Sequence, residues 1–193
     1  MNVIYLHGFA SSPASIKAKL LQNYCAQHAD LKLYLPDLNC CVQQALQNIS
    51  ELIDHLSDVV LIGSSFGGFY ATQMVVKHDI PAVLINPAMR PWQLFRDLYG
   101  KDQLPYVVHP NWTLDEAQLS FLEQIAVSNV HDFSKVLVLL QQGDEVLNYQ
   151  EAVDYYSAAH PAMLMSEAKG NHAMDDFADK IPLALQFLSD CLQ

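Results

Sequence analysis

The chain has 193 residues, the usual size of one domain and long enough to enclose a sizeable hydrophobic core. Hydrophobic residues make up 51% of it and charged residues 16%, a balance typical of a folded globular protein rather than a disordered one. The net charge of −11 argues against a protein that neutralises nucleic-acid phosphates, and against a polybasic protein of membrane surfaces. We therefore expect a single domain over residues 1–193, with neither nucleic acid nor membrane as a partner.

The N-terminus and the cysteines predict the compartment. The first residues, MNVIYLHGF, lack the basic and long apolar segments of a secretory signal peptide. No apolar run approaches the roughly 18–20 residues that span a bilayer. The 4 cysteines have no CxxC spacing, and the 8 histidines form no cluster of zinc-site spacing. These features predict a cytoplasmic protein with free thiols, no metal and no cofactor.

Six short apolar runs recur along the chain, each flanked by Gly, Pro, Asn or Asp. The runs are continuous rather than alternating, as expected for strands that are covered on both faces. Stretches with helical patterns lie between and after them. The expected strands are 2–7, 31–35, 58–63, 81–86, 135–141 and 162–167, and the expected helices are 15–28, 41–56, 67–78, 148–159 and 177–192. This alternation predicts a three-layer α/β fold, with a mostly parallel six-stranded sheet between helices.

One stretch, at about residues 87–134, interrupts this alternation. It is several times longer than a simple crossover requires. It contains both tryptophans, Trp92 and Trp112, and both arginines, Arg90 and Arg96. Long insertions of this kind either cover a site or add helices against the sheet, and we expect a small cap.

The strongest functional motif is GSSFGG, residues 63–68, between an expected strand and an expected helix. It fits the pattern GxSxG with Ser65 at its centre. A strand-to-helix turn of this kind exposes the central hydroxyl above the sheet and directs it at the helix N-terminus, whose free N–H groups can stabilise an oxyanion. The motif predicts that Ser65 is a nucleophile and that the Phe66 N–H is one oxyanion donor.

A serine nucleophile needs a base, and in this kind of fold an acid and then a histidine follow the serine on loops after strands. His172 directly follows the last expected strand, whereas the other histidines downstream of Ser65 do not follow a strand in this way. Asp144 comes first after the turn that ends strand 135–141, so we expect it to orient the imidazole. Its neighbour Glu145 is the competing candidate.

We expect the second oxyanion donor to come from the loop after the first strand, HGFASSP at residues 7–13. Its His-Gly pair is similar to the oxyanion turn of lipases and esterases, so the Phe9 amide is the candidate. We expect His7 itself to brace the loop from beneath the site.

Arg90 follows the strand at 81–86, at the sheet edge where open α/β sheets bind ligands. In a chain of net charge −11, a guanidinium there suits an anionic substrate, so we predict a substrate-binding role. The structural alternative is a salt bridge that ties the insertion to the rest of the fold.

The segments YLHGFASSP, GSSFGG, NPAMRP, LLQQGDEVLNY and GNHA, in this order, resemble those of the YqiA-like small bacterial esterases of the α/β-hydrolase superfamily. The resemblance runs from Met1 to the C-terminus and is weakest over about residues 99–134. It implies an α/β-hydrolase fold with strand order 2-1-3-4-5-6. It also implies carboxylesterase or thioesterase activity, with Ser65, Asp144 and His172 as a catalytic triad.

The expected function is therefore that of a serine esterase, which hydrolyses a small acyl ester through an acyl-enzyme. One alternative is an acyl-CoA thioesterase, which uses the same triad on a different leaving group. Another is a binding protein on a hydrolase scaffold, with an idle triad. Labelling with a fluorophosphonate separates the enzymes from the binding protein.

Overall fold

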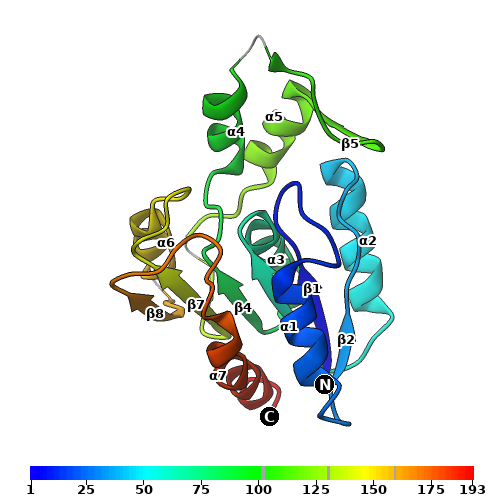
Figure 1. The fold of residues 1–193 in the computed structure, drawn as a ribbon, viewed down its shortest axis with the longest axis vertical. Coiled ribbons are helices and arrows are strands. Elements are labelled where there is room, and N and C mark those ends of the chain that lie inside the picture. The colour runs from blue at the N-terminus through cyan, green and yellow to red at the C-terminus, as the bar shows by residue number, and fades with distance from the viewer. Residues whose placement is uncertain (101–102, 130, 159) are drawn as a thin grey trace.

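The computed structural model describes residues 1–100, 103–129, 131–158 and 160–193. A six-stranded sheet with helices on both faces forms its centre (Figure 1). Every strand of this sheet runs parallel to its neighbours. The order across the sheet is β2 (Lys32–Tyr34), β1 (Asn2–Leu6), β3 (Val59–Ser64), β4 (Ala82–Ile85), β7 (Val136–Gln141) and β8 (Met163–Glu167). Counting these six strands along the chain, the order is 2-1-3-4-5-6, which confirms the expectation.

The helices form two layers. Helices α1 (Ile16–Cys25) and α7 (Phe177–Asp190) cover one face of the sheet. Helices α2 (Val42–Asp54), α3 (Phe66–His78) and α6 (Tyr149–Tyr156) cover the other. Successive residues of a strand point to opposite faces, and both faces are buried, so the strands need continuous apolar runs.

No helix of the described ranges is long and apolar enough to cross a membrane.

Most of the observed helices are shorter than the expected ones, and at two N-termini this is because the capping residue stands outside the helix. Ser15 is the N-cap of α1, and its side chain accepts a hydrogen bond from the Ala18 N–H. Asn148 caps α6 in the same way through the Gln150 N–H. The expected helix 148–159 ends at Tyr156, and Ala159 lies outside the described residues.

The insertion contains more structure than the sequence predicted. Its described residues form α4 (Pro91–Tyr99), α5 (Glu116–Ile125) and, between them, an antiparallel hairpin of β5 (Tyr106–His109) and β6 (Trp112–Leu114). These elements lie beyond the carboxyl ends of the strands, at the top of Figure 1. Their buried residues belong to the same core cluster as α2 and α3. The insertion is thus packed onto one side of the sheet's upper edge.

Candidate active site

Ser65 stands at the turn between β3 and α3, in a backbone conformation that only glycine adopts easily. Its φ is +54° and its ψ is −117°. Two hydrogen bonds hold this conformation: the Ser65 N–H donates to the Ile85 carbonyl at 2.9 Å, and the Ala88 N–H donates to the Ser65 carbonyl at 3.0 Å. Strain of this kind persists only where the surroundings fix it, and it is common at functional sites.

Two glycines of the motif are needed because other parts of the backbone pass too close to them to leave room for a Cβ atom. A Cβ on Gly67 would overlap the carbonyl oxygen of Leu6, because the end of β1 passes directly against the start of α3. A Cβ on Gly63 would overlap the backbone of Gly67. The small residues therefore allow β1, β3 and α3 to converge, which places the Ser65 side chain next to the loop that follows β1.

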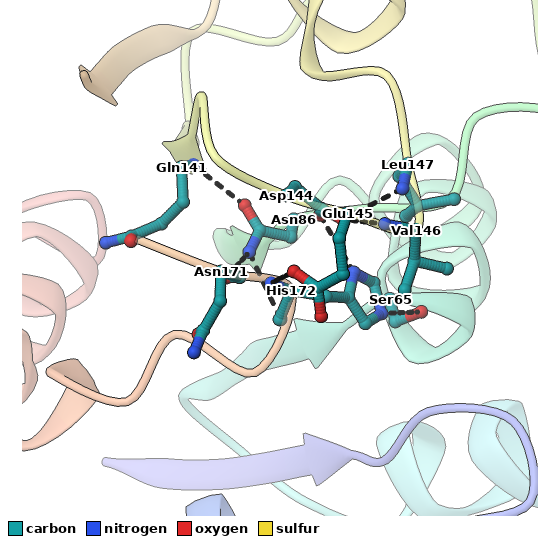
Figure 2. Close-up of polar contacts among 9 residues, drawn as sticks. All are labelled: Ser65, Asn86, Gln141, Asp144, Glu145, Val146, Leu147, Asn171 and His172. Atoms are coloured by element: carbon teal, nitrogen blue, oxygen red, sulfur yellow. Dashed lines mark hydrogen bonds and ion pairs between the residues drawn. The ribbon is translucent and has the colours of Figure 1, made fainter. Parts of the chain in front are cut away.

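The structure brings Ser65, His172 and Asp144 together from three separate loops (Figure 2). The Nε2 atom of His172 lies 3.0 Å from the Ser65 Oγ. The Nδ1 atom lies 2.8 Å from Oδ2 of Asp144. Because the carboxylate can only accept, Nδ1 carries the proton and Nε2 accepts the serine hydroxyl hydrogen. In this arrangement Nε2 is free to take the proton when the hydroxyl reacts.

The Asp144 carboxylate is held by the loop that it begins. Its Oδ1 accepts the N–H groups of Val146 and Leu147, both at 2.8 Å, and its side chain is only 2% exposed. Burial by itself raises the pKa of Asp144, but the hydrogen bonds from His172 and from these two amides outweigh it. The pKa therefore lies below its ordinary value, and the group is a fixed anion at neutral pH.

Glu145, the competing acid, contacts a different part of the same histidine. Its Oε2 accepts the backbone N–H of His172 at 3.0 Å. The geometry thus assigns the imidazole contact to Asp144 and the main-chain contact to Glu145. The two neighbouring carboxylates hold His172 at its ring and at its backbone.

Asn86 joins the loop that carries His172, between β8 and α7, to the ends of strands β4 and β7. It was not among the residues predicted from the sequence. Its Nδ2 donates to the carbonyl oxygens of Asn171 and His172, at 3.1 and 3.2 Å, and its Oδ1 accepts the Gln141 N–H at 2.9 Å (Figure 2). The side chain is buried, and its φ of +40° suits asparagine better than most residues. The only sequence signal was the Asn-Pro pair at the end of an expected strand.

A polar cluster secures the other end of the same loop. The Gln141 side chain donates to Glu167 at 2.6 Å and to Asp176 at 3.1 Å. The buried ammonium of Lys180 bridges the same two carboxylates at 2.8 Å each. The cluster ties β7, β8 and α7 together on both sides of the loop that carries His172.

Within the described ranges, no group of three or more His, Cys, Asp or Glu side chains is arranged to hold a metal ion.

The two candidate oxyanion donors flank Ser65. A Cβ built on Gly8 would lie 3.4 Å from the Ser65 Cβ and 3.9 Å from its Oγ, so the loop of Phe9 runs beside the serine. Phe66 is the first residue of α3, and an N–H at this helix position has no partner within the helix. The Phe9 and Phe66 rings lie 4.3 and 5.5 Å from the Phe95 ring, centroid to centroid. The insertion therefore helps to position both residues.

His7 braces this loop from below. Its Nδ1 donates to the Gly8 carbonyl at 2.9 Å, and its Nε2 accepts the Leu38 N–H at 3.0 Å. These two bonds require the neutral imidazole, and burial lowers the pKa of His7. The side chain is 2% exposed. Its position agrees with the structural role expected from the sequence.

Ser65 and His172 open into a cavity of about 480 Å³. Much of its wall is apolar and comes from α4, α1 and the loop after β1. Two of the apolar residues at its edge are strongly exposed: Ile16 at 77% and Leu98 at 59%. The lining residues are Tyr5, Gly8, Phe9, Ser11, Ser15, Ile16, Lys17, Leu20, Ser64, Ser65, Phe66, Ala88, Leu94, Phe95, Leu98, Val146, His172, Ala173, Met174 and Asp175.

Arg90 does not line this cavity. Its guanidinium binds both carboxylate oxygens of Glu151 on α6, at 2.6 and 3.2 Å. The Arg90 side chain is 58% exposed. This is the geometry of the structural alternative, a salt bridge between the insertion and the rest of the fold. The substrate-binding role stays a prediction.

Comparison with known proteins places the chain in a family. The model of an uncharacterised protein family, UPF0227, matches residues 2–189. A UPF0227 protein of Pectobacterium atrosepticum is 27% identical over 165 residues, which are 80% of this chain and 83% of that protein. A second one, from Pectobacterium carotovorum, is 26% identical over 163 residues, 81% of this chain and 82% of that protein. The resemblance expected from the sequence motifs is confirmed.

Solved structures confirm the fold. Mouse alpha/beta hydrolase domain-containing protein 10 superposes with a TM-score of 0.76 at 16% identity, over 100% of this chain and 90% of that one. Est1E of Butyrivibrio proteoclasticus, solved with ferulic acid, gives 0.75 at 17% identity, over 99% and 88%. An esterase of Pyrococcus furiosus gives 0.69 at 12% identity, over 100% and 82%. At these identities the likeness establishes the α/β-hydrolase fold.

Proposed function

The chain belongs to the uncharacterised protein family UPF0227, and we propose that it is a serine esterase that hydrolyses acyl esters. The observation that carries this proposal is the hydrogen-bonded series Ser65–His172–Asp144, with the serine in a strained turn at the wall of a cavity. A serine hydroxyl is a weak nucleophile, and this arrangement supplies the base that activates it.

In the first half of the reaction, the Ser65 Oγ attacks the acyl carbonyl carbon. Nε2 of His172 takes the hydroxyl proton, and the fixed Asp144 carboxylate stabilises the resulting imidazolium. The tetrahedral intermediate collapses, the alcohol leaves with the proton from Nε2, and an acyl-enzyme remains. In the second half, water attacks the acyl-enzyme with the same base, and the carboxylic acid leaves.

The negative charge of the tetrahedral intermediate needs donors that are already in place. The N–H groups of Phe9 and Phe66 are our candidates, because both residues flank Ser65 and their rings are anchored on Phe95. Preorganised donors of this kind supply a large share of the rate enhancement.

The cavity favours a small acyl substrate. The side chains of Leu94, Phe95 and Leu98 offer an apolar wall to the acyl group. One of the compared structures is an esterase of Pyrococcus furiosus, and another, Est1E, holds bound ferulic acid. We bring only the reaction class from them to this chain.

The test is hydrolysis of a panel of 4-nitrophenyl esters and acyl thioesters by the wild type and by Ser65→Ala. We expect the variant to fold normally and to lose at least about four orders of magnitude in kcat. Ser166→Ala, an exposed serine on β8, is the control and should retain wild-type activity. A fluorophosphonate should label the wild type and Ser166→Ala but not Ser65→Ala.

Full turnover by Ser65→Ala would exclude the proposed nucleophile. A wild type that neither labels nor hydrolyses any member of the panel would favour the binding-protein alternative. Relative rates on matched esters and thioesters would decide between an esterase and a thioesterase.

A further inference from the structure

Lys17 lies in the wall of the cavity that contains Ser65 and His172. It stands in the first turn of α1, between Ile16 and Ala18. Among the described residues that line this cavity, it is the one lysine or arginine. The cavity thus has an apolar wall from α4 and a cationic group from α1.

Four other lysine and arginine side chains are already paired with carboxylates. The salt bridges formed among the described residues use Arg90, Arg96, Lys135 and Lys180, but not Lys17. Arg90 in particular, the sequence-based candidate for binding an anionic substrate, is paired with Glu151. In the described part of the chain, Lys17 therefore faces the cavity without a salt bridge.

Lys17 is partly buried, and two carboxylates lie near enough to interact with its charge. Burial lowers the pKa of its ammonium, although the negative charges of Asp175 and Asp144 act in the opposite direction. A partly desolvated ammonium attracts an anion more strongly than a fully hydrated one does. Asp175 also lines the cavity, but its Oδ2 accepts a hydrogen bond from the Asn171 side chain at 2.7 Å.

We propose that Lys17 is a substrate-binding residue whose ammonium binds an anionic oxygen group, a carboxylate or a phosphate, carried by the ester substrate. This inference rests on the proposed esterase function and specifies the substrate class. The substrate then combines an acyl carbonyl at Ser65 with a negative charge within reach of α1. In a chain of net charge −11, a local cation is needed to offset repulsion of such a substrate.

The test uses pairs of esters that differ in one charge. Mono-4-nitrophenyl glutarate and 4-nitrophenyl pentanoate place or omit a carboxylate on the acyl side. In the second pair, phenyl pentanoate with and without a phosphate group para to the ester oxygen, the negative charge is placed on or omitted from the leaving group. The readout is the ratio of kcat/KM for the anionic ester over the neutral one, in each pair.

We expect Lys17→Met to lower this ratio about tenfold in at least one pair, as for the loss of one charge-assisted hydrogen bond. The pair that responds identifies the anion and the side on which it lies. Lys17→Arg should retain most of the preference. Lys19→Met is the matched control, because Lys19 lies on the same helix, is exposed and does not line the cavity.

An unchanged ratio in both pairs for Lys17→Met would overturn the inference. An equal fall in Lys19→Met would also overturn it, because the effect would then come from net charge alone. After either of these two outcomes, hydrolysis of neutral esters by the wild type through Ser65 would still support the proposed esterase function, and only the role of Lys17 would be rejected.

A binding measurement makes the test independent of turnover. Two pairs of ligands are titrated into the Ser65→Ala protein, and binding is followed by ligand-observed NMR. The first pair is monomethyl glutarate and methyl pentanoate, and the second is phenyl pentanoate with and without its para phosphate. We expect tighter binding of the anionic member of the responding pair, and loss of this preference in Ser65→Ala/Lys17→Met. Equal binding of both members in both pairs would contradict the inference even if no ester is hydrolysed.

Discussion

The Glu145 carboxylate accepts a hydrogen bond of 3.0 Å from the backbone N–H of His172. The adjacent Asp144 binds the imidazole of the same residue at 2.8 Å. Two acids that are neighbours in sequence thus have separate tasks on one histidine, one on the ring and one on the main chain. This difference makes their contributions separable by mutation.

We predict that Asp144→Asn lowers kcat by about three to four orders of magnitude, because the amide no longer stabilises the imidazolium and favours the wrong tautomer. Glu145→Gln should change kcat little, since its amide oxygen can still accept the His172 N–H. Ester hydrolysis under saturating substrate measures both. The reverse ranking would transfer the orienting role to Glu145.

We predict that Asn86→Ala lowers both stability and kcat. The substitution leaves the Gln141 N–H buried without its acceptor, which costs about 1–3 kcal/mol, and it frees the loop that carries His172. Urea unfolding gives the first effect, and kcat measured well below the melting temperature gives the second.

Thr72→Val is the control for Asn86→Ala. It removes buried hydrogen bonds to Tyr156 and to the Gly68 carbonyl, in the core between α3 and α6. It should destabilise the protein without a comparable fall in kcat. If both variants lose kcat only in proportion to their stability, Asn86 has a structural role alone.

For Arg90 we expect a structural effect. Arg90→Gln should lower the free energy of unfolding by less than about 1 kcal/mol, as for other exposed ion pairs. Glu151→Gln should have the same effect, and the double variant should add little, because either change breaks the same pair. A rise in KM for anionic esters alone, with neutral esters unaffected, would instead support the substrate-binding role predicted from the sequence.

His7 should make stability depend on pH. Its pKa in the folded protein is lowered by burial, so the unfolded chain binds the proton first as the pH falls. The contribution of the neutral His7 side chain to stability is therefore fully present above about pH 6.5. It decreases as the pH falls below this value, until the pH reaches the pKa of His7 in the folded protein. His7→Asn should reduce this slope by up to about 1.4 kcal/mol per pH unit. Urea unfolding between pH 7.5 and 5.5 measures it, and an equal slope in both proteins would exclude His7 as the source.

The sequence by itself determined the sheet and the order of its functional loops. Continuous apolar runs are required where both faces of a strand are buried, so the six strands could be located from composition and flanking residues alone. The turn at Ser65 was recognisable because close packing of β1, β3 and α3 demands small residues at Gly63 and Gly67. Asp144 and His172 could be selected because each lies on a loop that follows a strand.

Only the tertiary structure decided the contacts between side chains that are distant in sequence. Position along the loop favoured Asp144 over Glu145 for the imidazole contact, but only the path of the loop that carries His172 shows that Glu145 binds the backbone N–H of the same residue. Asn86 and Lys17 have ordinary sequence surroundings. Their importance comes from what folding places beside them, because hydrogen bonds and charge interactions depend on distance in space rather than along the chain.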